Sequence, residues 1–288
     1  MKNGEMNEMK REMCALAVVA AVFAAQAVEW KNVDAEHHLG GRKASEGYLQ
    51  GKVVLVERWG AKHPPCLALL SRVEEIWRSY KTKPFVALGG HCKGWGDAES
   101  AKKLIDENKI THPVYESAGL GVGEPPFDAI PFLYVVDETG RVVYKGRDDR
   151  TAIQAVVMAL TDLEAPRNVA QWKRFLDYEL EALPGRAYLR MNEFKKKFPA
   201  EAKAYADKFK ELAAVPDVKK LAELVEFAKK AKDRPVFTDK QKAQKKKFAD
   251  LVKSSIAKYT KLTESNDPRV VQEAKNSLAD LKWTAADL

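Results

Sequence analysis

The chain has 288 residues, of which 45% are hydrophobic and 31% are charged. This balance is typical of packed globular domains and excludes a disordered chain, and three cysteines are too few for a disulfide-rich scaffold. The net charge of +8 is unevenly distributed, because residues 165–288 carry 28 Lys and Arg against 18 Asp and Glu. Any attraction to acidic partners is therefore a property of the C-terminal part.

The first 27 residues have the parts of a secretory signal peptide. A basic start precedes an apolar run over residues 14–25, and Ala25-Gln26-Ala27 matches the A-x-A cleavage pattern. An uncleaved anchor or a buried helix is the alternative, although the run is short for a membrane span. We therefore expect a signal peptide at 1–27, export to the periplasm or cell envelope, and no transmembrane segment after cleavage.

Residues 28–163 alternate between short apolar strands and amphipathic helices and are expected to form the first domain. Apolar residues recur at steps of three and four after Pro64 and Pro65, which suit the first turn of a helix. The predicted strands are 52–58, 84–90, 132–136 and 142–144, and the predicted helices are 64–80, 97–108 and 150–163. A strand, a crossover helix and a parallel second strand place the ends of both strands on one edge of a sheet.

Histidine and cysteine side chains gather at this predicted edge. His63 and Cys66 follow the first strand, and His91 and Cys92 follow the second. Two imidazoles and two thiolates suit Zn or Cu, but adjacent residues of an extended segment point to opposite faces, which argues against His91 and Cys92 as joint ligands. Cys66 and Cys92 can instead pair, as a disulfide or an atypical redox couple, if their Cα atoms lie within about 7 Å.

Three segments resemble the thioredoxin superfamily, most of all its exported TlpA/ResA-like branch. W-G-A-K-H-P-P-C at 59–66 is similar to the family's W-A-x-W-C-P-P-C motif. A-I-P-F-L at 129–133 resembles the cis-proline loop, and V-V-D-E-T-G-R-V-V at 135–143 resembles the hairpin beyond it. The resemblance covers residues 45–163 and implies a thioredoxin-like α/β fold, with a central mixed sheet flanked by helices.

The resemblance also implies roles for single residues. Cys66 matches the second, resolving cysteine, Glu57 the buried acid that assists proton transfer, and Trp59 the tryptophan that flanks the motif. Pro131 matches the cis-proline, so the bond between Ile130 and Pro131 is expected to be cis. A protein or peptide partner would bind along the motif edge. The residues of that edge are Trp59, His63, Pro64, Pro65, Ile130 and Pro131.

His63 stands where the family has its attacking cysteine. Because imidazole cannot form a disulfide, the dithiol cycle within this motif is absent. The preferred function is a non-catalytic binding or assembly module of the cell envelope. The alternative is an atypical thiol-disulfide oxidoreductase in which Cys66, Glu57 and either Cys92 or a substrate thiol are catalytic. A lone reactive Cys66 and a Zn or Cu site made of His63, Cys66, His91 and Cys92 also remain open.

Residues 164–288 show only helical patterns and are expected to form a basic all-α domain, either a bundle or a short solenoid. The predicted helices are 169–183, 187–198, 200–214, 218–231, 239–262 and 268–281, with Leu183-Pro184-Gly185 ending the first and Pro199 stopping the second. The lysine-rich run 240–247 is either a solvated helix face or a surface attracted to anionic envelope lipid, polysaccharide or an acidic protein.

Two classes of ligand are not expected. Nucleic acid is an improbable partner for an exported protein, and aromatic residues are not interleaved with the C-terminal lysines. No cofactor is predicted, because the glycines between residues 89 and 96 do not match a phosphate-binding fingerprint.

Overall fold

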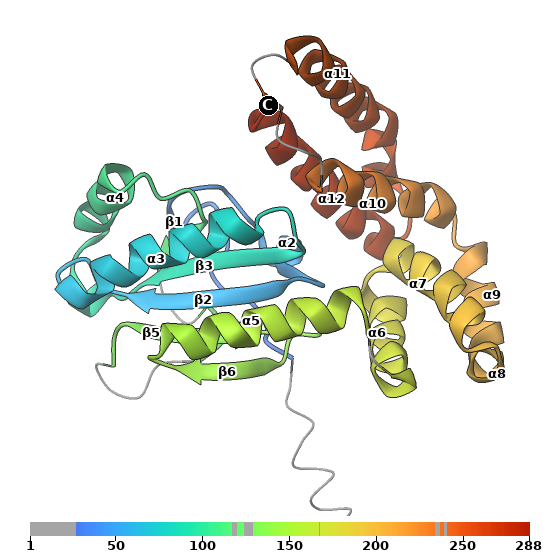
Figure 1. The fold of residues 1–288 in the computed structure, drawn as a ribbon, viewed down its shortest axis with the longest axis horizontal. Coiled ribbons are helices and arrows are strands. Elements are labelled where there is room, and N and C mark those ends of the chain that lie inside the picture. Colours follow the sequence, from blue (N-terminus) through green and yellow to red (C-terminus); the bar gives the residue numbers. More distant parts are fainter. Residues whose placement is uncertain (1–26, 117–119, 124–128, 167, 234–236, 239–240) are drawn as a thin grey trace, which may run out of the picture.

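The structure is a computed structural model that describes residues 27–116, 120–123, 129–166, 168–233, 237–238 and 241–288. The predicted signal peptide lies outside these ranges, apart from Ala27. Within them, no helix has the length and apolar character that crossing a membrane requires. A sheet-containing N-terminal part and a helical C-terminal part lie side by side (Figure 1).

The N-terminal part is built on a mixed sheet of six strands in the order β1-β4-β3-β2-β5-β6. The strands are β1 (His38–Gly40), β2 (Val53–Trp59), β3 (Phe85–His91), β4 (Val114–Glu116), β5 (Phe132–Val136) and β6 (Val142–Gly146). β2 and β3 are parallel, with Trp59 opposite His91, whereas β5 runs antiparallel to β2. The structure confirms the four predicted strands as β2, β3, β5 and β6, while β1 and β4 were not predicted.

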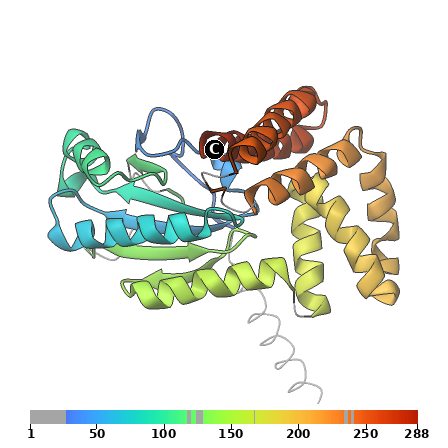
Figure 2. The ribbon, with the colours of Figure 1, turned by 45° about the horizontal axis from the view of Figure 1, so that its top comes forward.

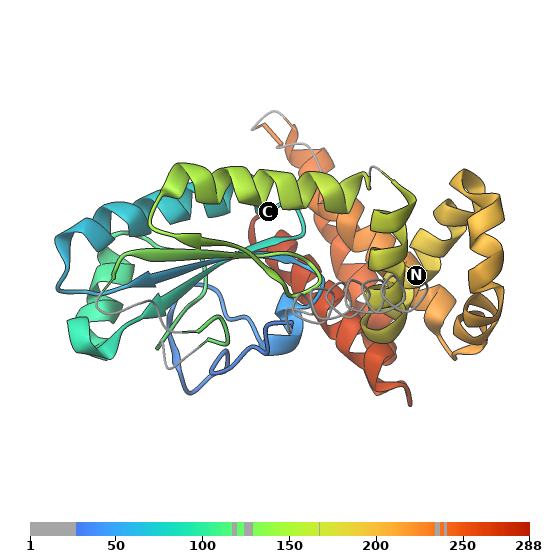
Figure 3. The same ribbon diagram turned by 90° about the horizontal axis from the view of Figure 1, so that it is seen from below.

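Helices flank this sheet. They are α2 (Glu46–Leu49), α3 (Pro64–Tyr80), α4 (Ala98–Glu107) and α5 (Asp149–Glu164). α3 and α5 cover one face, and α4 lies on the other (Figure 3). The apolar stripe of α3 buries Val73, Ile76 and Trp77 in the main core, to which α5 contributes Val156 and Leu160. The expected thioredoxin-like α/β fold is thus confirmed.

The C-terminal part is helical, as predicted. Its longer elements are α6 (Val169–Ala182), α7 (Pro184–Lys197), α8 (Pro199–Ala202), α9 (Ala206–Ala214), α10 (Val218–Lys232), α11 (Lys242–Tyr259) and α12 (Pro268–Ala286). The predicted helix ends at Leu183-Pro184-Gly185 and before Pro199 are confirmed. The second helix starts at Pro184 and not at Ala187, and Pro199 also opens the next helix, because proline fits the first helical position, where no N–H partner is needed. Gly185 belongs to α7 because its N–H donates to Glu273 of α12 at 2.7 Å.

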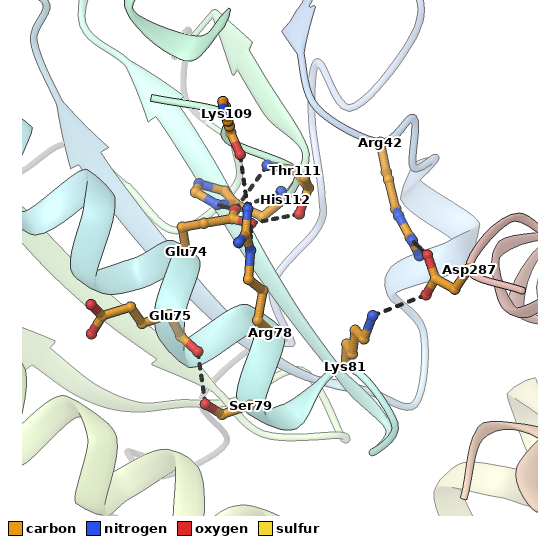
Figure 4. Close-up of polar contacts among 10 residues, drawn as sticks. All are labelled: Arg42, Glu74, Glu75, Arg78, Ser79, Lys81, Lys109, Thr111, His112 and Asp287. Carbon is orange, nitrogen blue, oxygen red and sulfur yellow. Dashed lines mark hydrogen bonds and ion pairs between the residues drawn. The ribbon is translucent and has the colours of Figure 1, made fainter. Parts of the chain in front are cut away.

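The last helix, α12, connects the two parts. The ring of Trp283 lies 4.7 Å from that of Tyr48 and 6.2 Å from that of Trp77. Asp287 accepts hydrogen bonds from Arg42 and, at 3.1 Å, from Lys81 (Figure 4). The C-terminal helices therefore close one end of the sheet, and the end where α3 begins lies away from them (Figures 1 and 2).

Candidate functional site

The motif at residues 59–66 comprises the last residue of β2, a tight loop over 60–63 and the first turn of α3, at the end of the sheet away from the C-terminal helices. The backbone N–H of Lys62 donates to the carbonyl of Trp95 at 2.8 Å, which ties this loop to the segment after β3. Gly60 has no room for a side chain, because a Cβ there would lie 2.2 Å from the Cβ of Trp95. The two loops that the sequence placed on one edge therefore pack directly against each other.

His63 and Cys66 form a close pair at the start of α3. Nδ1 of His63 lies 3.2 Å from Sγ of Cys66, within hydrogen-bond distance for sulfur. Cys66 is fully buried, and burial raises the pKa of its thiol to about 11 against the lowering effect of a backbone hydrogen bond at Gly60. The motif position expected to hold a nucleophile thus carries an imidazole, and the remaining thiol is buried and protonated.

His91 and Cys92 differ in their surroundings. His91 is fully buried, its ring lies 5.1 Å from that of Trp59, and neither ring nitrogen has a hydrogen-bond partner among the described residues. Burial lowers the pKa of His91, so the imidazole is neutral. Cys92 is half-buried and packs against the cluster that contains Cys66, but both cysteines are free.

The four candidate metal ligands share the sheet edge without converging on one point. Over the parts of the chain that the structure describes, no group of three or more His, Cys, Asp or Glu side chains could hold a metal ion. The imidazole of His63 faces Cys66, whereas His91 is enclosed beside Trp59. The geometry therefore offers no set of donors that would favour Zn or Cu here.

Glu57 and Trp59 lie on β2 and are fully buried. Neither carboxylate oxygen of Glu57 has a hydrogen-bond partner among the described residues, and the same holds for Nε1 of Trp59. Burial raises the pKa of Glu57 well above its usual range, which favours the protonated, neutral carboxyl. A neutral buried acid thus accompanies the neutral buried thiol of Cys66.

The proline loop completes the edge. The peptide bond between Ile130 and Pro131 is cis. Ile130 is buried in the same apolar cluster as Trp59 and Cys66, so this loop and the motif meet. Pro64 and Pro65 are exposed in the first turn of α3.

One aromatic residue of this edge was missing from the predicted site. The half-buried Trp95 places its ring 5.1 Å from that of His63, in an edge-to-face arrangement. The sequence does carry a signal for it, a tryptophan between Gly94 and Gly96 just after the second predicted strand. Gly96 adopts a φ of 128°, a conformation open to glycine, and so allows the chain to turn there.

No protein-family model matches the chain. One curated protein, SUPPRESSOR OF QUENCHING 1 of the Arabidopsis thaliana chloroplast, is 26% identical over 127 residues. The matched region is 42% of this chain but 12% of that protein, so the chain spans only a small part of this relative's length.

Several solved structures with low sequence identity are similar to this chain. A thiol:disulfide interchange protein from Chlorobium tepidum TLS is 20% identical, with a TM-score of 0.38 over 43% of this chain and 90% of its own. A thiol-disulfide isomerase from Corynebacterium glutamicum is 22% identical, with a TM-score of 0.39 over 48% and 97%. A secreted thiol-disulfide isomerase from the same organism is 19% identical, with a TM-score of 0.37 over 45% and 82%. These likenesses concern the fold alone.

Four features match the thioredoxin-like fold that the sequence predicts: the strand order, the crossover helix, the motif loop and the cis-proline loop. The N-terminal part of the chain therefore has a thioredoxin-like fold, and a helical region follows it.

Proposed function

We propose that this chain is an exported binding or assembly module, in which the thioredoxin-like domain holds a protein partner without exchanging disulfides. The observation that carries the proposal is the state of Cys66, which is fully buried beside the His63 imidazole. With a pKa of about 11, about one thiol in ten thousand would be ionised at pH 7. Since the thiolate is the reactive form, neither motif position supplies a nucleophile.

The motif edge has features that suit a protein partner. His63 and Trp95 present half-buried rings beside the cis-proline loop, and tryptophan is among the residues that contribute most to binding at protein interfaces. The edge lies at the end of the sheet opposite the C-terminal helices, so those helices leave it accessible (Figure 1). An extended partner segment would pair with backbone groups of the proline loop.

Location in the periplasm or cell envelope is part of the same proposal. It is supported by the pattern of the first 27 residues, with an apolar run and an A-x-A site. In that oxidising setting, a buried Cys66 is protected from oxidation.

Insulin disulfide reduction by the purified mature protein, with glutathione as the reductant, tests whether the protein catalyses disulfide exchange. His63→Cys, which restores two cysteines to the motif, is the positive control, and His63→Ser is the matched variant without a second thiol. We expect the wild type and His63→Ser to equal the reagent blank and His63→Cys to exceed it. The proposal is wrong if the wild type reduces insulin as fast as His63→Cys does.

The atypical oxidoreductase has one observation in its favour, because Cys92 packs against the cluster that contains Cys66. Thiol titration of the native protein in glutathione buffers separates the two functions. We expect both thiols to remain titratable after unfolding at every glutathione potential. A reducible bond lost in both Cys66→Ala and Cys92→Ala would instead establish the redox pair.

Site-directed photo-crosslinking in the native compartment tests the binding edge. A crosslinking amino acid at the exposed Lys62, within the motif loop, is expected to give a discrete adduct that Trp95→Ala removes. The matched control replaces Lys102, an exposed lysine on α4. Equal adduct patterns from both positions would contradict the assignment of the partner to the motif edge.

A further inference from the structure

A lysine-lined groove lies between α11 and the C-terminal end of α12. It has a volume of about 380 Å³, and four exposed lysines of α11 line it together with small and apolar residues of both helices. The lining residues are Lys242, Lys245, Lys246, Ala249, Lys253, Ala285 and Leu288. α11 stands at the outer side of the helical region, away from the sheet (Figures 1 and 2).

The positive charge of this groove is not neutralised within the described residues. None of the four lysines forms an ion pair there, although Lys230, Lys232 and Lys258 of the same region each pair with an acid. α11 contains a single acidic residue, Asp250, and no ion pair joins it to a lysine in the part of the chain that the structure describes. The groove is therefore a local concentration of positive charge.

The position of the lysines in α11 adds to the electrostatic repulsion in this groove. Lys242, Lys245 and Lys246 fall in the first two turns of α11, where the helix dipole is positive, and the first turn of the helix contains no acidic residue. A cation near a helix N-terminus is unfavourable, because the helix dipole favours negative charge there. An anion in the groove would relieve this repulsion as well as pair with the lysines.

The groove fits a narrow, linear polyanion better than other anionic partners. Lys242, Lys246 and Lys253 form a stripe about 16 Å long at the helical rise per residue, so a chain with several charges can contact them together. Leu251 is the one large apolar side chain of α11 that is exposed, which is too small an apolar face for a helix lying in a lipid surface. No aromatic ring lines the groove to stack on bases.

The cations of the groove are all lysines. The lysine ammonium is a compact point charge that binds phosphate oxygens in many orientations, whereas the planar arginine fork imposes one geometry on a carboxylate or a phosphate. We infer that the groove between α11 and α12 binds a linear phosphate-bearing polyanion through Lys242, Lys245, Lys246 and Lys253, without sequence or stereochemical readout. This inference is independent of the function proposed for the thioredoxin-like domain.

The test is fluorescence anisotropy of a labelled short inorganic polyphosphate chain, titrated with the mature protein at several NaCl concentrations. Release of counterions by four lysine contacts predicts a slope of about −3 for log affinity against log salt. Lys242→Gln/Lys246→Gln/Lys253→Gln should lower the affinity at low salt at least about tenfold and reduce the slope to about −1. Gln keeps a helix propensity close to that of Lys, so α11 should stay folded, which circular dichroism checks.

The matched control removes the same net charge elsewhere, with Lys203→Gln/Lys210→Gln/Lys219→Gln. These three lysines are exposed in the helical region and have no ion pair among the described residues. We expect the control to retain wild-type affinity within about twofold. Equal losses in both variants, or no binding by the wild type, would overturn the inference. So would tighter binding to polyglutamate or to phosphatidylglycerol vesicles than to polyphosphate.

Discussion

Replacing Glu74 by glutamine is expected to destabilise the thioredoxin-like domain at neutral pH and to have little effect in acid. Glu74 lies on α3, is 5% exposed and joins that helix to the segment before β4 (Figure 4). Its carboxylate accepts hydrogen bonds from the N–H of Thr111 at 2.8 Å, from the N–H of His112 at 3.1 Å and from Nε of Arg78 at 2.6 Å. The hydroxyl of Thr111 and Nδ1 of His112 add contacts at 2.6 and 2.9 Å.

The size of the expected loss of stability in Glu74→Gln follows from the pKa of the Glu74 carboxyl. Burial alone would raise the pKa of Glu74, but the hydrogen bonds from His112, Thr111 and Arg78 outweigh it and lower the pKa from 4.5 to about 2. At 1.36 kcal/mol per pH unit this corresponds to about 3 kcal/mol. The Arg78 side chain is 56% exposed, so solvent screens its share, and about 2 kcal/mol is the expected value.

The sign of the pH dependence is set by the direction of the shift. A carboxyl whose pKa is lowered by folding stabilises the folded state above its unfolded pKa of 4.5. That stability is lost as the pH falls from about 4.5 towards 2. Glutamine retains one carbonyl acceptor but no charge, so the difference between wild type and Glu74→Gln should shrink over this range.

Urea unfolding at pH 7, 5, 4 and 3, followed by near-UV circular dichroism, measures this difference. Thr111→Val, which removes one hydroxyl donor to the same carboxylate and leaves its charge, is the matched comparison. A destabilisation of Glu74→Gln that stays the same from pH 7 to pH 3 would refute the reasoning, because it would show that packing and not charge stabilises the site.

Two further stability predictions concern opposite ends of the sheet. Glu57→Met should raise the free energy of unfolding by about 1–3 kcal/mol, because it removes a buried carboxyl that lacks a partner among the described residues; a loss of stability in urea would contradict this. Trp283→Ala should lower the free energy of unfolding by about 2–3 kcal/mol, since the half-buried ring packs on Tyr48 and Trp77. No change in the same assay would contradict this.

The parts of the fold that the sequence predicts well are those with a local pattern. Apolar residues at helical spacing after Pro64 predict α3 over residues 64–80, as observed. β2 and β3 are recognisable because they are buried on both faces and rich in apolar residues. Such signals depend on neighbours in sequence and need no knowledge of the tertiary structure.

The elements that escaped prediction depend on distant contacts. β1 and β4 have three residues each, and their pairing joins His38 to Tyr115 across the chain. Pro184 and Gly185 look like a helix end in sequence, but the N–H of Gly185 is held by Glu273 of α12. A short strand or a helix start fixed by a residue far along the chain leaves no periodic signal.

The candidate site was predictable in position more than in detail. Strand ends on one sheet edge placed His63, Cys66 and Cys92 together, and the structure shows the first two at the start of α3 and Cys92 in the adjoining segment after β3. The contact of Trp95 with His63 depends on the close approach that Gly60 allows, which spacing along the chain does not encode. The buried acid Glu74 was also missed, although its place on the apolar side of α3 is a signal that such a residue has internal partners.

The two motif positions contribute to different properties of the domain, and this explains how a thioredoxin-like fold tolerates the histidine. His63 is the N-cap residue of α3, with extended backbone angles and a half-buried side chain, so the position accepts residues of different size. Cys66, one helical turn later, is fully buried in the apolar cluster with Trp59 and Ile130, where a small side chain is required by packing. The residue at the first position can therefore change while the packing at the second position is retained.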